Sequence, residues 1–287
     1  MTQETGLKRM LLALPADGAS ELALDAAVVL ARSLKLDIVA LLLEDEGGYH
    51  AVAYPSAVEF VDVTQERRPT DATRLARDYD LSLRRSERRL RDVAARANMS
   101  ISCIRVRGRL DRAALADLGQ ADLLAVFDPP SVLARAFGAL SALGREIGTP
   151  ERVLAVPATP TARRGKVVVL AGRDRAPATM AFAATLARLQ DAQLEMWTSD
   201  EGSDGAAEAG PPGVVVRSAA DLEREGGLRR RLAREARLLI VDPRAGQSFD
   251  LAKVIHLARR AHTPILALGP VTEEADDSVD AAAPDSA

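Results

Sequence analysis

Short apolar runs without alternating polar residues recur along this chain and constrain its fold more than any other feature. Asp37–Leu43 is the clearest run, and Arg9–Leu14 and Asp122–Phe127 have the same character. A strand that is covered on both faces loses the alternation that a half-exposed strand shows. Amphipathic segments lie between the runs, and the longest, Asp71–Ala97, is apolar on one side and rich in arginine on the other. The pattern predicts an α/β fold with an open parallel sheet and helices on both faces.

The remaining elements of the first half follow from the same periodicity. Further strands are expected at Ser100–Val106 and Arg152–Val156, and further helices at Asp111–Leu118 and Val132–Ile147. Glu44–Pro69 contains a glycine pair and two prolines, so we expect it to be irregular.

The second half repeats the first in a more divergent form. It opens with the strand-like run Lys166–Leu170, and Gly202–Gly213 stands where the first half has its long helix. We therefore expect two tandem domains, at residues 1–158 and 166–270, of which the second is smaller and lacks one helix. Three matched pairs support the repeat: Leu30-Ala31-Arg32 with Leu186-Ala187-Arg188, Asp128-Pro129 with Asp242-Pro243, and Thr149-Pro150 with Thr263-Pro264.

Composition and charge argue against several classes of protein. The hydrophobic fraction of 47% is enough for packed cores, and no apolar run has the length that a membrane-spanning helix needs. Residues 271–287 are acidic without a basic residue, so we expect a disordered tail. The arginines are dispersed among acidic residues, and aromatic residues make up only 3%, which argues against nucleic-acid binding. The single Cys103 is compatible with a reducing cytoplasm.

The segment LALDAAVVLARSLKLDIVALLLEDEG, with the Asp-Gly turn before it and a late Thr-Pro-strand, resembles the universal stress protein family. APATMAFAATLARLQDAQLEMWTSDEG resembles it in the second half, and the resemblance covers residues 7 to 270. It implies a five-stranded parallel sheet in each copy, like those of adenine nucleotide hydrolases, and pairing through the last strands. It also implies, for many members, ATP held by a first-strand Asp, a Gly-x-x-Gly loop and a Gly-Ser or Gly-Thr pair.

The residues that match those ATP-binding positions are mostly of other types. Pro15 stands at the position of the first-strand Asp, with Asp17 and Gly18 just after it. Asp128-Pro129-Pro130 replaces the glycine loop of the first copy, and Asp242-Pro243 replaces that of the second. Gly138 keeps the place of the Gly-Ser pair, but Ala139 replaces the hydroxyl. Proline has no amide to donate and a carboxylate repels phosphate, so the sequence disfavours ATP as a cofactor.

Asp17, Gly18, Asp128, Gly138 and Asp242 nevertheless follow predicted strands, where open α/β sheets bind ligands. They are the candidate cleft residues, with turn and cap roles as the alternative. The spacing of His256 and His262 does not suit metal binding, and we predict no catalytic residues or metal site.

The sequence favours a cytoplasmic, non-enzymatic regulatory protein of the universal stress type. It would bind a protein partner or self-associate, and its two copies would form an internal pseudo-dimer through their last strands. Two alternatives stay open: a member that binds ATP through unusual residues around Asp17 and Gly138, and an enzyme of the wider nucleotide-hydrolase superfamily.

Overall fold

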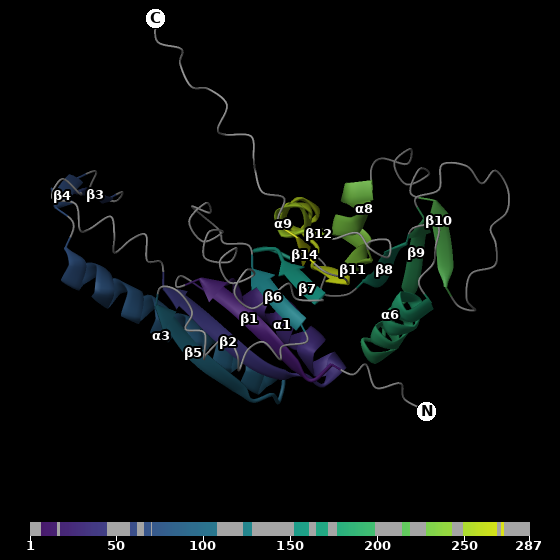
Figure 1. Cartoon of the computed structure of the whole chain (residues 1–287), viewed down its shortest axis with the longest axis horizontal. Helices are drawn as coiled ribbons and strands as arrows, with labels where there is room; N and C mark the ends of the chain where they lie inside the picture. Colours follow the sequence, from purple (N-terminus) through teal and green to yellow (C-terminus); the bar gives the residue numbers. More distant parts are fainter. Residues whose placement is uncertain are drawn as a thin grey trace, which may run out of the picture.

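A ten-stranded sheet spans both halves of the chain in the computed structural model (Figure 1). The structure describes residues 7–15, 18–44, 58–61, 66–69, 71–107, 123–127, 152–160, 165–171, 177–198, 214–218, 228–242, 249–268 and 271–272. The strands lie in the order β10-β9-β8-β11-β13-β7-β6-β1-β2-β5. Neighbouring strands are parallel throughout, except that β7 and β13 are antiparallel.

Where the sequence predicted a strand with bounds, the structure has one that begins and ends close to them. In the first half they are β1 (Arg9–Pro15), β2 (Asp37–Glu44), β5 (Ile101–Arg107), β6 (Leu123–Phe127) and β7 (Arg152–Val156). In the second half they are β8 (Lys166–Ala171), β9 (Leu194–Thr198), β10 (Val215–Ser218), β11 (Ala236–Val241) and β13 (Ile265–Leu268).

The two halves have the same strand order. Numbered within its own half, each set of five runs 3-2-1-4-5 across the sheet. The halves meet where β7 pairs with β13, and Leu154 lies opposite Leu266 in that pair. The expectation that the strands Arg152–Val156 and Pro264–Leu268 lie together is confirmed at the level of strand pairing, and the predicted α/β fold is confirmed with it. The domain boundaries at 158 and 166 stay predictions.

Helices cover both faces of the sheet, as Figure 1 shows. Three of them pack on one face, α1 (Glu21–Leu34), α3 (Ala72–Arg96) and α6 (Pro177–Leu189), and α8 (Leu228–Glu235) and α9 (Leu251–Ala261) pack on the other. Strand side chains alternate between these two cores. In β1, Met10, Leu12 and Leu14 face α1 and α3, and Leu11 and Ala13 face the other way. This two-sided burial explains why the strand sequences lack alternation.

Local capping sets the ends of the first-half helices. The Ser20 hydroxyl accepts a hydrogen bond from the amide of Ala23 at 3.1 Å, and Lys35 ends α1 in the left-handed conformation. The Asp71 carboxylate accepts from the amide of Thr73 at 2.8 Å, so α3 starts where the sequence predicted it. α3 has 25 residues, whereas only residues 199–214 join β9 to β10. The smaller second half stays a prediction, because residues 199–213 lie outside the described ranges.

Two short pairings were not predicted. β3 (Val58–Val61) and β4 (Glu66–Pro69) form an antiparallel hairpin within the segment that we expected to be irregular. Valines and a phenylalanine favour a strand there, although glycines and prolines nearby argue against one. β12 (Phe249–Asp250) and β14 (Val271–Thr272) form a separate parallel pair. The predicted helices at 111–118 and 132–147, the loop at 202–213 and the rest of the acidic tail lie outside the described residues.

Candidate functional site

The sheet has two points where the chain leaves neighbouring parallel strands in opposite directions. One lies between β1 and β6, and its counterpart in the second half lies between β8 and β11. Ligands of open α/β sheets bind at the carboxyl ends of strands at such points. Gly18 follows β1 and Asp242 follows β11, so the structure places both at these positions. The other three candidates, Asp17, Asp128 and Gly138, lie outside the described residues.

Gly18 is buried against helix α3. Its φ of 79° belongs to the left-handed region, and a Cβ placed on it would lie 2.4 Å from the Oγ of Ser86. The neighbouring carbonyl of Ala19 accepts a hydrogen bond of 3.1 Å from Nη1 of Arg89, which also belongs to α3. The turn after β1 therefore packs against α3 and is hydrogen-bonded to it. Gly18 makes that close approach possible.

Asp242 is half-buried and bonded to the first turn of α6. Its Oδ2 accepts a hydrogen bond from the hydroxyl of Thr179, a residue with only 8% of its surface exposed. The contact joins the carboxyl end of β11 to the amino-terminal turn of α6. A carboxylate thus lies where the second half would have to receive an anionic ligand, and its charge opposes one.

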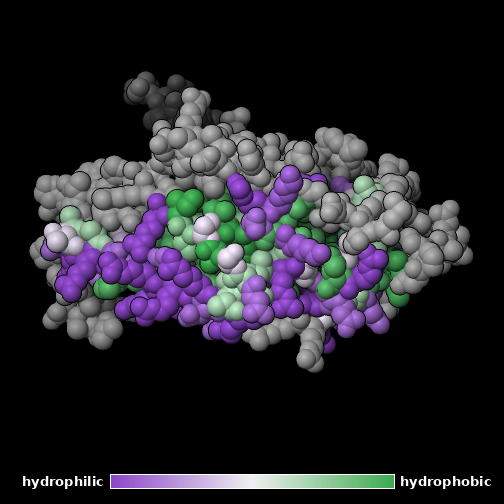
Figure 2. All heavy atoms as spheres, turned by 90° about the horizontal axis from the view of Figure 1, so that it is seen from below, coloured by the Kyte–Doolittle hydropathy of each residue, from purple (hydrophilic) through white to green (hydrophobic). Residues whose placement is uncertain are grey.

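Sequence reasoning missed a pocket at the seam between the halves. The cavity measures about 90 Å³ and opens to solvent, and its apolar wall includes Val29 of α1, Leu154 of β7, Leu238 of β11 and Pro264. Figure 2 shows this face of the molecule, with apolar surface in the middle and hydrophilic surface on either side. The pocket has no local sequence signal because its wall comes from segments far apart in the chain.

The link between the halves passes beside this pocket and is held from both sides. The carbonyl of Ala158 accepts a hydrogen bond from the hydroxyl of Ser20, at the start of α1. Oγ1 of Thr159 lies 3.2 Å from Nδ1 of His262, at the end of α9. The first contact ties the link to the first half and the second ties it to the second half, which fits a link too short to let the halves separate.

Three polar residues complete the pocket wall. Asp25 comes from α1, Gln190 from the end of α6, and Arg237 from the start of β11. Nη1 of Arg237 donates a hydrogen bond of 3.1 Å to the carbonyl of Gln190. Burial lowers the pKa of Arg237, because a partly desolvated guanidinium is less stable in its charged form. The pocket therefore combines an apolar wall with a cation and an anion.

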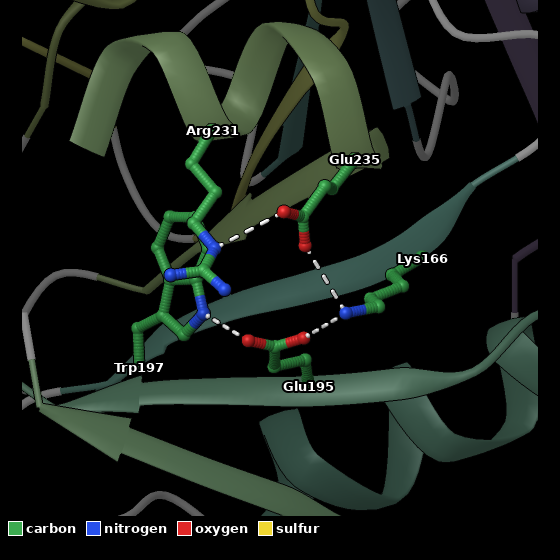
Figure 3. Close-up of polar contacts among 5 residues, drawn as sticks. All are labelled: Lys166, Glu195, Trp197, Arg231 and Glu235. Atoms are coloured by element: carbon green, nitrogen blue, oxygen red, sulfur yellow. Dashed lines mark hydrogen bonds and ion pairs between the residues drawn. The ribbon is translucent and has the colours of Figure 1, made fainter. Parts of the chain in front are cut away.

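A second feature without a sequence signal is a buried ionic network in the second half (Figure 3). Glu195 of β9 is 1% exposed, and it accepts hydrogen bonds from Nε1 of Trp197 at 2.9 Å and from Nζ of Lys166 at 2.8 Å. Lys166 also lies 3.2 Å from Glu235, which in turn accepts from Nε of Arg231 at 3.2 Å. The hydrogen bond from Lys166 to Glu195 raises the pKa of Lys166.

This network lies at the amino ends of the strands rather than at the ligand edge. Lys166 is the first residue of β8, and Glu235 immediately precedes β11. Its charges are paired within the network, and it ties β8, β9 and α8 together. We assign it to stability, because ligands of such sheets bind at the opposite edge.

The arginine-rich side of α3 forms surface ion pairs. Arg105 of β5 contacts Asp80 at 2.9 Å and Glu87 at 3.0 Å, and Arg84 contacts Asp80 at 2.8 Å. Exposed pairs of this kind add little to stability. They fit a solvated surface on the arginine-rich side of the helix.

Comparison with solved structures gives the fold a family context. A universal stress protein from Archaeoglobus fulgidus DSM 4304 aligns with a TM-score of 0.52 and 11% identity, over 91% of this chain and 96% of that one. A Pseudomonas aeruginosa UCBPP-PA14 protein provisionally described as a universal stress protein aligns with a TM-score of 0.50 and 13% identity, over 93% and 95%. The chain has the fold of the universal stress proteins. The resemblance predicted from sequence is thus supported at the level of fold.

Comparisons at the level of sequence found no match. The sequence matches no family profile, and no curated protein matches it. Within the described ranges, no cluster of three or more His, Cys, Asp or Glu side chains could hold a metal ion. The helices that the structure describes include none with the length and hydropathy to cross a bilayer.

Proposed function

We propose that this chain is a non-enzymatic, cytoplasmic protein of the universal stress type that regulates a process by binding a protein partner or by self-association. Its halves would be degenerate copies, and the β7–β13 pair would be the internal form of an interface between two such copies. The shared 3-2-1-4-5 strand order supports the duplication. The antiparallel pairing of the last strands supports the pseudo-dimer.

The observation that carries the proposal is the position of Asp242. Its carboxylate follows β11 and is bonded to Thr179 at the start of α6. A polyphosphate needs convergent amides or cations at this edge, and the sequence offers Asp242-Pro243 instead. Losing amide donors and adding a nearby carboxylate each cost about 1 to 3 kcal/mol. Together they would weaken a micromolar site to about millimolar.

Titration with Mg-ATP by calorimetry tests this proposal. We expect no saturable binding below about 1 mM, because phosphate would meet a carboxylate and prolines. Asp242→Asn keeps an acceptor for Thr179 and removes the charge, so it should not weaken whatever residual affinity exists. Submillimolar binding by the unmodified protein would refute the eroded site. In that case Arg135→Ala and Arg244→Ala would show which half holds the nucleotide, because these arginines follow the aspartate-proline sequences of the first and second halves.

A further inference from the structure

The seam pocket has a composition that neither the fold nor the proposed loss of ATP binding explains. Its apolar wall includes Val29, Leu154 and Leu238, while Asp25 and Arg237 bring opposite charges from α1 and β11. A pocket with one anion, one cation and an apolar wall is complementary to a ligand with the same three parts. An α-amino acid with an aliphatic side chain has an ammonium, a carboxylate and an apolar chain.

Arg237 is suited to receive the carboxylate. Among the described residues its guanidinium makes one hydrogen bond, to the carbonyl of Gln190, and no ion pair. A guanidinium has five N–H donors in a planar fork that matches a carboxylate. Because Arg237 is half-buried beside apolar side chains, a charge-assisted hydrogen bond there is stronger than one in water.

Asp25 is suited to receive the ammonium. It lines the same pocket from helix α1 and is partly exposed, so an amine at the pocket mouth can reach it. A carboxylate has two oxygens and several lone pairs, and Asp25 can accept from an ammonium in addition to its other contacts. A ligand with only a carboxylate would be repelled by Asp25, and one with only an amine would be repelled by Arg237.

The size of the cavity limits the side chain of the ligand. The pocket measures about 90 Å³. A dry cavity of about 150 Å³ accepts benzene. The pocket is smaller than that cavity, so it suits a branched chain of three or four carbon atoms better than an aromatic ring.

We propose that the seam pocket binds a small branched-chain amino acid of the size of valine or leucine. Arg237 would hold its carboxylate, Asp25 its ammonium, and Leu154, Leu238 and Val29 its side chain. The ligand would contact α1 and β7 of one half and β11 of the other, so its binding would strengthen the seam. This inference does not depend on whether the protein binds ATP.

Calorimetric titration of the full chain with L-leucine is the test. We expect a dissociation constant between about 10 µM and 1 mM for a ligand of this size. L-phenylalanine should not bind. 4-Methylpentanoate, which lacks the ammonium, and 3-methylbutylamine, which lacks the carboxylate, should each bind at least about tenfold more weakly.

Matched variants separate the three parts of the pocket. Arg237→Gln and Asp25→Asn should each weaken leucine binding at least about tenfold, and Asp25→Asn should not weaken the binding of 4-methylpentanoate. Ala26→Leu fills the pocket from α1 without changing charge and should abolish binding. The control Arg188→Gln, an exposed residue of α6 outside the pocket wall, should bind like the unmodified protein.

Two results would overturn the proposal. One is the absence of saturation by leucine and valine up to about 10 mM in protein that melts cooperatively. The other is leucine binding that Asp25→Asn and Ala26→Leu leave unchanged. Asp25 and Ala26 lie on the partly exposed side of α1, so both variants should fold even if Arg237→Gln does not.

Discussion

Gly18 shows how closely the turn after β1 approaches helix α3. Its φ of 79° is unfavourable for any residue with a Cβ, and that Cβ would lie 2.4 Å from Oγ of Ser86. Gly18→Ala should therefore lower the free energy of unfolding by about 1 to 3 kcal/mol, measured by urea denaturation. The backbone strain and the clash contribute separately to this loss.

Ser86→Ala serves as the control for that prediction. It removes Oγ and leaves Cβ of Ser86 as the nearest atom, at 3.2 Å. Gly18→Ala should then cost less in the Ser86→Ala background than in the unmodified chain, with a coupling of at least about 0.5 kcal/mol. If Gly18→Ala lowers the free energy of unfolding equally in both backgrounds, Ser86 of α3 does not restrict the space beside Gly18.

The network around Glu195 acts at the scale of elements, because it joins β8, β9 and α8. Lys166→Met leaves the buried Glu195 without its cation, and should destabilise the protein by about 3 to 5 kcal/mol. The double variant Lys166→Met with Glu195→Gln should recover much of this loss, since Trp197 can still donate to the amide oxygen. A double variant no more stable than the single one would contradict this account.

The same network predicts that the stability of the folded protein falls at alkaline pH. The pKa of Lys166 in the folded protein is raised above its ordinary value of 10.5 by the hydrogen bond to Glu195. The stabilisation is therefore complete below pH 10.5 and is lost as the pH rises through the folded pKa. Urea denaturation at several pH values should show a steeper loss above pH 10.5 for the unmodified chain than for Lys166→Met.

At the scale of the whole molecule, the antiparallel pair β7–β13 makes two half-sheets into one. Val153 lies opposite Ala267. Opposite Cα atoms in an antiparallel pair are about 4.5 to 5.5 Å apart, which a disulfide can bridge. Cysteines at Val153 and Ala267 in a Cys103→Ser background should therefore crosslink within one chain, as read by mass spectrometry of a nonreduced digest.

A register control makes this test specific. Ile265 lies opposite Ala155, so a cysteine pair at Val153 and Ile265 is displaced along the strands and should crosslink poorly. Disulfides formed only between two chains would show that the seam belongs to an intermolecular dimer. They would also argue against the pseudo-dimer in the proposed function.

The sequence by itself determined the elements, because strand burial and helix periodicity are local properties. β7 begins and ends at the predicted Arg152 and Val156, and α3 differs from its prediction by one residue at each end. The cap of α1 is likewise local, because the Ser20 hydroxyl accepts from an amide only three residues later. The β3–β4 hairpin was missed because its short strands carry weak signals among glycines and prolines.

Only the tertiary structure decided which distant residues meet. Gly18 and Asp242 were predicted as cleft residues, but their contacts with Ser86 and Thr179 depend on how α3 and α6 pack. Lys166 and Glu195 are 29 residues apart in the sequence, and the pairing of β8 with β9 brings them together. The seam pocket depends on the antiparallel meeting of β7 and β13, because that pairing brings α1 of one half beside β11 of the other. Such contacts leave no periodic trace in a sequence, since they form between side chains that only the folded backbone places side by side.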